Sequence, residues 1–227
     1  GILPKYQNQT SMSSSARNSR WALGLFALLL FTCLGVYGQS TSSQPTALER
    51  TRSTRSWQRS ERAAFKNPQT SPLDSGHIKG FRLPFFPINP SLAQTVRWER
   101  CADSNWFEMS TSTERKPLYR KYAYLYFQYE GQTLRLTAFQ SQALQERDGF
   151  EDYLFVPFGD ETNGHETYGG GRYVEVERGD WVLDFNQAYN PYCAYSGRWS
   201  CPKVPQENLL DVRIEAGTRY KPMAGHL

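Results

Sequence analysis

The feature that most constrains the fold is one segment in which aromatic side chains alternate. Residues 119–130, YRKYAYLYFQYE, place Tyr122, Tyr124 and Tyr126 on one side of an extended chain, with Leu125 and Phe127 on the other. A period of two is typical of a β-strand whose faces meet different surroundings. The following Glu130-Gly131-Gln132 predicts a tight turn into a second strand over 133–139. We therefore expect a hairpin at the centre of the domain.

Shorter segments of the same kind surround this hairpin. Of the 33 aromatic residues, 25 fall within residues 81–200. We expect further strands at 95–100, 153–158, 172–177, 180–185 and 209–216, with a second hairpin turning at Arg178-Gly179-Asp180. The chain shows no alternation of strands and helices, no phosphate-loop motif and no internal repeat. The predicted fold is mainly β, an antiparallel sandwich or partly closed barrel with a short N-terminal helix, after a signal peptide.

The N-terminal part has the pattern of an export signal. Arg17 and Arg20 precede the uncharged apolar run 21–36, and Val36-Tyr37-Gly38 offers a cleavage site. We expect residues 1–38 to be a signal peptide with a possible upstream extension before Met12, and the protein to be exported to the periplasm or the extracellular space. The alternative is a membrane anchor formed by residues 21–38, although the run is short for a span.

Charge is unevenly distributed along the chain. Residues 1–66 carry nine basic and two acidic side chains, whereas the remainder carries 17 basic and 20 acidic ones. We predict a disordered, solvated linker over 39–56, a short amphipathic helix over 57–66 and a single β-rich domain over 57–227. A nucleic-acid partner is not expected, and membrane contact is expected only through an uncleaved N-terminal segment.

The region from Phe155 to Asn208 is the richest in motifs. It contains LFVPFGDET (154–162), ETYGGGRY (166–173), DFNQAYNPYCAY (184–195), Cys201-Pro202 and Glu207-Asn208. Together with the segments 71–73 and 81–87, these motifs resemble the uncharacterised bacterial family called "domain of unknown function 1684" over about residues 57–221. The resemblance implies no activity. The family's closing Gly-Glu-Lys is Gly217-Thr218-Arg219 here.

Several polar side chains in these motifs are candidate ligand contacts. Three glycines at 169–171 allow close approach of a ligand to the backbone, or form a turn with a bulge. Arg172 either pairs with a ligand carboxylate or binds Asp160 or Asp184 internally. Polar tips on aromatic walls suit a small-ligand pocket, whereas Asn and Asp near turns also bond their own backbone. The candidate ligand-binding residues are Asp160, Glu166, Tyr168, Arg172, Asn186, Tyr189, Asn190 and Tyr195.

The sequence also contains residues that could carry metal or thiol chemistry. Asp160, His165 and Glu166 do not have the spacing of a known metal site, so we predict neither metal nor cofactor. In an oxidising compartment Cys193 and Cys201 are expected to form a disulfide, with Cys101 free or buried. The alternatives are a bridge from Cys101 to one of the others, or Cys193 acting as a nucleophile with His165 as its base.

Three classes of function remain open. The preferred one is an exported β-rich domain that binds a small ligand in an aromatic-lined pocket. The second is a hydrolase that uses the region of Asp160, Glu166 and Cys193. The third is a structural or interaction protein whose motifs stabilise a corner of the fold. Convergence of Tyr168, Arg172, Asn186 and Tyr189 on one cleft would separate the first two from the third.

Overall fold

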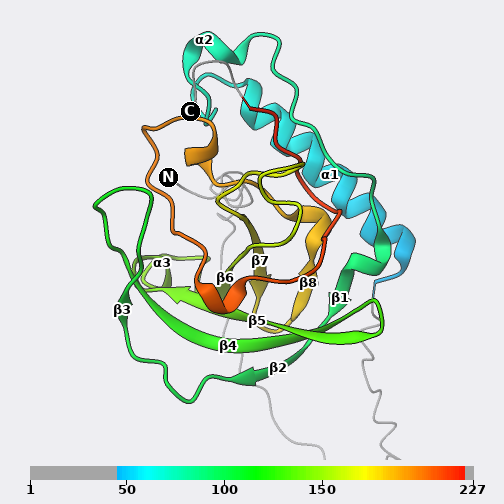
Figure 1. Cartoon of the computed structure of the whole chain (residues 1–227), viewed down its shortest axis with the longest axis vertical. Coiled ribbons are helices and arrows are strands. Elements are labelled where there is room, and N and C mark those ends of the chain that lie inside the picture. Colours follow the sequence, from blue (N-terminus) through cyan, green and yellow to red (C-terminus); the bar gives the residue numbers. More distant parts are fainter. Residues whose placement is uncertain (1–44, 223–227) are drawn as a thin grey trace, which may run out of the picture. The chain divides into compact units, whose positions relative to one another are not determined.

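The computed structural model describes residues 45–222, and residues 47–222 belong to one compact unit (Figure 1). The predicted signal peptide and residues 39–44 of the predicted linker lie outside the described residues. Within residues 45–222, no helix is both long and apolar enough to cross a membrane. The helices are α1 (Ala47–Lys66), α2 (Ser75–Ile78), α3 (Gln142–Gln145) and the 3-10 turns η3 (Pro90–Leu92), η4 (Phe185–Gln187), η5 (Tyr192–Ala194) and η6 (Gln206–Asn208). The strands are β1 (Ala93–Thr95), β2 (Arg97–Arg100), β3 (Phe107–Glu108), β4 (Leu118–Tyr129), β5 (Gln132–Ser141), β6 (Tyr153–Phe158), β7 (Arg172–Glu177) and β8 (Val182–Asp184).

One antiparallel sheet organises the domain. Its strands follow the order β2-β4-β5-β6-β7, and β3 also pairs with β4. The central hairpin is present as predicted, because Glu130 and Gly131 both adopt positive φ, at 48° and 81°, in the turn between β4 and β5. The mainly β, antiparallel fold class is thereby confirmed.

The second predicted hairpin is wrong. The chain does turn after β7, but β8 pairs with β1 in a separate two-stranded sheet, with Leu183 opposite Gln94. Local turn residues show that the chain reverses, whereas the partner of a three-residue strand is chosen by packing elsewhere. The predicted strand over 209–216 is also absent, and that segment is irregular apart from an isolated bridge at Leu209.

The two faces of the sheet bury different side chains. Leu125, Leu136, Val156 and Val174 alternate onto one face and join a single aliphatic-rich core. The opposite face of β6 and β7 carries aromatic rings, including Phe155 and Tyr173, whose centroids are 4.7 Å apart. The strands thus place mostly aliphatic side chains on one face of the sheet and aromatic rings on the opposite face of β6 and β7.

Helix α1 is longer than predicted and starts inside the predicted linker. Its buried residues Thr54, Gln58, Glu61 and Phe65 recur at helical spacing and face the β body. Three of the four are polar, so a search for apolar periodicity detects only the last turns. Residues 47–56 are therefore part of the folded unit rather than a solvated linker.

Candidate functional site

Asp160 and Arg172 form a buried ion pair instead of a ligand site. Both side chains are fully buried, and Nη2 of Arg172 lies 3.1 Å from Oδ1 of Asp160. The guanidinium also donates to the carbonyls of Ile214, at 2.8 Å, and Ala216. The other carboxylate oxygen of Asp160 accepts a hydrogen bond from the backbone N–H of Ile214 at 2.7 Å. These bonds replace the strand pairing predicted for this segment.

Burial strongly affects the chemistry of this pair. Burial lowers the pKa of Arg172, whereas Asp160 opposes that change. A charged pair with hydrogen bonds on both partners is the arrangement that a protein interior tolerates. Asp160 and Arg172 thus hold the segment around Ile214 against the sheet.

Four other predicted residues also bond to the protein itself. Asn186 exchanges two hydrogen bonds with the backbone of Asn89, at 2.7 and 2.8 Å. Tyr189 donates from its hydroxyl to Oε1 of Glu175 at 2.9 Å. The polar tips predicted to form a pocket floor are therefore engaged in corners of the fold.

Asn190 and Tyr195 also form hydrogen bonds within the protein, and Glu166 forms an ion pair. Asn190 donates to the hydroxyl of Tyr195 at 2.9 Å and to the carbonyl of Arg219 at 3.2 Å. Glu166 pairs with Arg213 at 2.7 Å. His165 lies between Asp160 and Glu166 in sequence, but within residues 45–222 no group of three His, Cys, Asp or Glu side chains could hold a metal ion.

Tyr168 is the predicted residue that lines a pocket, which we call the thiol pocket. This pocket has a volume of about 350 Å³, a size at the lower end of the range for small-ligand sites. Its lining consists of Ser112, Gly159, Asn163, Tyr168, Gly169, Gly170, Gly171, Pro191, Cys193, Cys201, Pro202, Lys203, Val204 and Leu209. Lys203 is the one charged residue of that lining.

Two of the three glycines, Gly170 and Gly171, shape this pocket through close approach. A Cβ on Gly170 would lie 2.6 Å from Cε1 of Tyr168, so the missing side chain leaves room for the ring. Gly171 has φ +87°, and a Cβ there would lie 2.7 Å from the carbonyl oxygen of Phe158. Gly170 and Gly171 thus allow the Tyr168 loop to pack close to β6.

Two cysteines meet in the thiol pocket. Both are free thiols in the structure, so the predicted disulfide stays a prediction. The backbone N–H of Cys193 donates to Sγ of Cys201 over 3.1 Å. A hydrogen bond from the Cys201 thiol, supported by Ser112 and Tyr168, lowers the pKa of Cys193 to about 7 in spite of burial.

Cys201 has the opposite character. It is 7% exposed, and its hydrogen bond to Cys193 together with burial raises its pKa. The sequence contained both cysteines and the glycine run, but no motif indicated that they share a pocket with Tyr168. The thiol pocket was therefore missed because its walls come from loops far apart in the chain.

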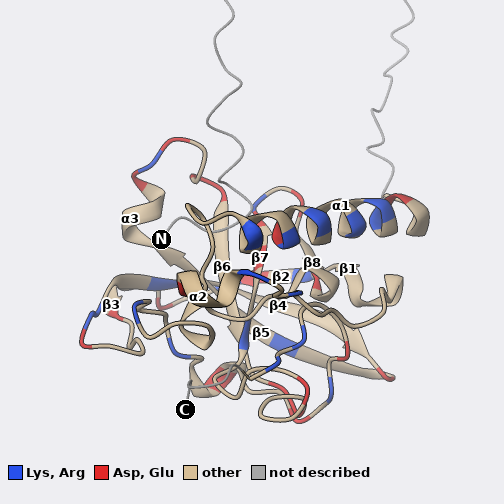
Figure 2. Ribbon diagram, turned by 90° about the horizontal axis from the view of Figure 1, so that it is seen from above, with Lys and Arg blue, Asp and Glu red and all other residues tan. Residues whose placement is uncertain are grey.

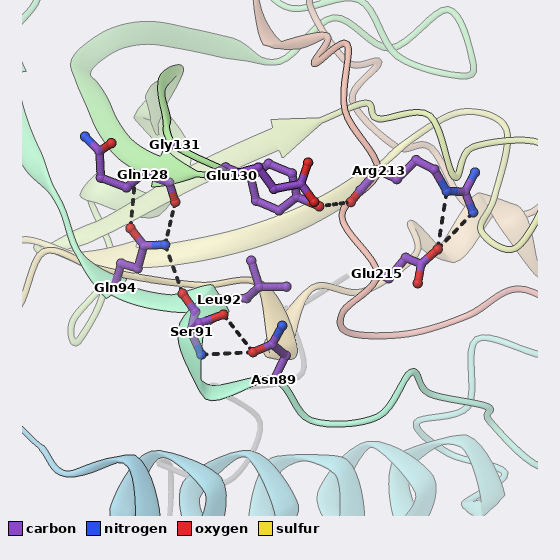
Figure 3. A pocket seen from close by; sticks show the side chains of 10 residues that line it. Asn89, Ser91, Leu92, Gln94, Gln128, Glu130, Gly131, Arg213 and Glu215 are labelled. Atoms are coloured by element: carbon purple, nitrogen blue, oxygen red, sulfur yellow. Dashed lines mark hydrogen bonds and ion pairs between the residues drawn. The ribbon is translucent and has the colours of Figure 1, made fainter.

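A larger hollow lies at the turn of the β4–β5 hairpin (Figure 3). Its polar groups bond largely to one another: Gln94 contacts the backbone of Ser91 and Gln128 at 2.9 and 2.7 Å, and Arg213 pairs with Glu215 at 3.1 Å. Since these groups already have partners, the thiol pocket is the better candidate for ligand binding.

Comparison with known proteins supports the motif-based resemblance. The sequence profile described as "Protein of unknown function (DUF1684)" matches residues 80–219. A search of curated proteins finds no match. The solution NMR structure of an uncharacterized protein from Haloarcula marismortui is similar, with 30% sequence identity and a TM-score of 0.60 over 76% of this chain and 95% of that chain. The chain therefore belongs to the DUF1684 family of proteins of unknown function.

Proposed function

We propose that this domain binds a small organic acid in the thiol pocket. The observation that carries the proposal is the lining itself, which combines apolar walls from Tyr168, Pro191, Val204 and Leu209 with one basic side chain and no acidic one. Lys203 is exposed and takes part in none of the ion pairs found among residues 45–222. A single cation beside an apolar wall suits a carboxylate with a hydrocarbon part.

The test is a thermal-shift screen of the full chain with small aliphatic and aromatic carboxylic acids. Each acid is paired with its primary amide, which has the same shape without the charge. We expect the acids to raise the melting temperature and the amides to do so much less, because ligands that bind only the folded state stabilise it.

Substitution of Lys203 gives the matched control. Lys203→Gln is expected to weaken acid binding about tenfold, the size of one lost charge-assisted hydrogen bond. Lys221→Gln removes another exposed lysine outside the pocket lining and should leave the affinity unchanged. A flat screen, or equal shifts from acids and amides, would contradict the proposal and favour the structural role.

An enzymatic role is the second candidate, and the lowered pKa of the Cys193 thiol favours it. The two carboxylates of the predicted hydrolase region form ion pairs within the protein: Asp160 pairs with Arg172, and Glu166 pairs with Arg213. A hydrolase would then depend on the thiolate alone. Hydrolysis of activated esters that survives in Cys193→Ser would exclude this role.

We also propose export of the protein, supported by Arg17, Arg20 and the apolar run 21–36. N-terminal sequencing of the protein recovered from cell fractions tests this. Cleavage after Gly38 is expected. An intact N-terminus in the membrane fraction would favour the anchor alternative.

A further inference from the structure

The two cysteines of the thiol pocket differ in the ways that a reactive pair requires. Cys193 is half-buried in η5, whereas Cys201 is buried beside the bridge between Thr111 and Pro202. The contact between the Cys193 N–H and the Cys201 sulfur holds the two residues together across an eight-residue separation. Cys193 is thus the more accessible of the two cysteines that line the pocket.

The surrounding hydrogen bonds assign separate roles to the two sulfurs. Hydrogen bonds from the Cys201 thiol and from Tyr168 favour the thiolate of Cys193, and the thiolate is the attacking form of cysteine. Cys201 keeps its proton near neutral pH because that proton is shared with Cys193. This asymmetry matches an attacking and a resolving cysteine.

We propose that Cys193 and Cys201 form a reversible thiol–disulfide pair that reduces small disulfides, with Cys193 as the attacking sulfur. The thiolate of Cys193 attacks one sulfur of the substrate, whose S–S bond breaks and releases the first thiolate. Cys201 then loses its proton to solvent and attacks Sγ of Cys193, which releases the second thiolate. Two electrons pass from the protein dithiol to the substrate, which becomes two thiols.

The pocket supports this chemistry independently of acid binding. Both sulfurs line it, and its volume of about 350 Å³ admits a small disulfide. Cys101 provides an internal comparison, since it is 3% exposed and burial raises its pKa. Its thiol is expected to be inert under the same conditions.

The experiment equilibrates the full chain carrying Cys33→Ser in glutathione buffers of increasing oxidation and counts alkylated cysteines by intact mass, since Cys33 is the one other cysteine of the sequence. We expect Cys193 and Cys201 to lose reactivity together while Cys101 stays reduced. Cys201→Ser should accumulate a mixed disulfide at Cys193, and Cys193→Ser should accumulate none. Cys101→Ser is the matched control and should behave as the unsubstituted chain.

Two results would overturn this inference. One is that both thiols remain alkylatable in oxidising buffer while circular dichroism shows the fold intact. The other is a mixed disulfide that forms equally well on Cys201 in the Cys193→Ser protein. Both results are read from the redox state of the cysteines, whereas acid binding is read from the melting temperature, so the two failures are distinguishable.

A second inference rests on the outer surface of α1. Arg52, Arg55, Arg59, Arg62 and Lys66 are all exposed and follow one another at spacings of three and four. This spacing places them in one stripe of roughly 21 Å along the helix. Figure 2 shows basic positions repeating along α1.

The basic stripe continues into an apolar groove. Arg62 and Lys66 also line a groove of about 820 Å³, together with Lys79, Arg82 and the apolar side chains Phe65, Ile78, Phe81 and Leu83. That lining contains no acidic residue. A row of cations beside an apolar groove matches the headgroups and upper acyl chains of an anionic lipid surface.

The geometry points to α1 as a docking face for anionic membranes. The stripe is entirely basic, whereas the rest of the described domain, residues 67–222, holds 17 basic and 20 acidic side chains. A polyanion that surrounds the protein, such as nucleic acid, would meet that excess of acid.

The test is co-sedimentation of the full chain with phosphatidylglycerol-containing vesicles and with pure phosphatidylcholine vesicles. Binding only to the anionic vesicles is expected. Changing Arg52, Arg55, Arg59 and Arg62 to Gln should weaken it at least tenfold, since basic residues near an anionic surface each contribute to the attraction. The same number of substitutions on the β body, at Lys116, Arg135, Arg147 and Lys221, should have little effect.

Contrary outcomes are equally specific. Equal binding by the two quadruple variants would show that general charge, not the stripe, is responsible. Absence of vesicle binding, or tighter binding to duplex DNA than to anionic vesicles at the same salt concentration, would overturn the membrane assignment.

Discussion

Helix α1 and the β body are stabilised in contrasting ways. The helix carries six basic and two acidic residues over 20 positions and presents mostly polar side chains to the body. The β body instead buries aliphatic and aromatic residues on its strands. A buried ion pair holds the irregular segment around Ile214 against the sheet. The comparison shows that one chain can combine a body specified by apolar burial with a helix whose buried face is mostly polar and whose buried apolar residue, Phe65, packs against Phe81 and Tyr195.

The two regions should therefore respond differently to mutation and pH. Changes at tightly packed or paired buried positions of the β body should cost up to several kcal/mol, because they leave buried groups without partners or overpack them. Changes in α1 should be smaller and depend on pH, because a buried titratable group lies at its contact with the body.

The largest effect is expected when the buried ion pair of the body is broken. Arg172→Met leaves Asp160 buried without its cation and removes donors to Ile214 and Ala216. We expect a loss of about 3–5 kcal/mol in the free energy of unfolding, measured by urea denaturation. Lys116→Gln removes an exposed partner of Glu108 and should cost under about 1 kcal/mol. Similar losses in the two variants would contradict the structural role of Arg172.

The glycine loop of the body should show the next largest effect. In Gly171→Ala the new Cβ would lie 2.7 Å from the carbonyl oxygen of Phe158, at φ +87°. We expect a destabilisation of roughly 2–4 kcal/mol from overpacking combined with backbone strain. Gly179→Ala has a similar φ of +101° but nothing within 4 Å, so it isolates the strain and should cost about 1 kcal/mol. Equal losses of unfolding free energy in the two variants would show that close packing at Gly171 does not contribute.

The stability of the contact between α1 and the body should depend on pH, because Glu61 titrates there. Burial and the nearby Glu175 raise the pKa of Glu61 from 4.5 to about 8. The folded state therefore holds this proton more tightly than the unfolded chain does. The stabilisation that comes from the protonated Glu61 is fully present below pH 4.5 and is lost as the pH rises toward 8. Over this range the free energy of unfolding should fall by up to about 1.4 kcal/mol per pH unit.

Glu61→Gln tests this titration directly. The variant should be more stable than the parent at pH 8 and should show a flatter dependence of unfolding free energy on pH. Urea denaturation at several pH values measures both. An unchanged slope would show that Glu61 does not titrate between the folded and unfolded states.

The smallest effect is expected at the exposed start of α1. Glu49 lies in the first turn of the helix, where a negative charge interacts favourably with the helix dipole. Glu49→Gln should cost about 0.3–1 kcal/mol and should lose its effect at high salt. A cost comparable with that of Arg172→Met would mean that α1 is not the weaker region.

The sequence predicted the parts of the fold that local patterns control. Alternation in residues 119–130 and the Glu130-Gly131 turn correctly identified the central hairpin. The start of α1 was missed because Thr54 and Gln58 do not read as apolar positions, although both are buried. The linker prediction was wrong for the same reason, since its three basic residues, Arg50, Arg52 and Arg55, all lie on α1.

The candidate site could be predicted only in fragments. Tyr168, the glycine run and both cysteines were recognised separately, but their convergence depends on loops brought together by β6, η5 and the bridge at Thr111. Arg172 shows why the sequence was not sufficient, because it did not distinguish a ligand carboxylate from Asp160 as the partner of the guanidinium. Burial settled the choice, since an arginine in the interior requires a fixed partner.

The sequence by itself determined the family, the mainly β class and the central hairpin, because these depend on contiguous motifs and on periodicity along the chain. Tertiary structure alone decided that β8 pairs with β1, that Arg172 binds Asp160, and that Cys193 and Cys201 share a pocket with Tyr168. These outcomes depend on which distant groups become buried together. That burial sets the free energy of each polar contact, and local sequence carries little information about it.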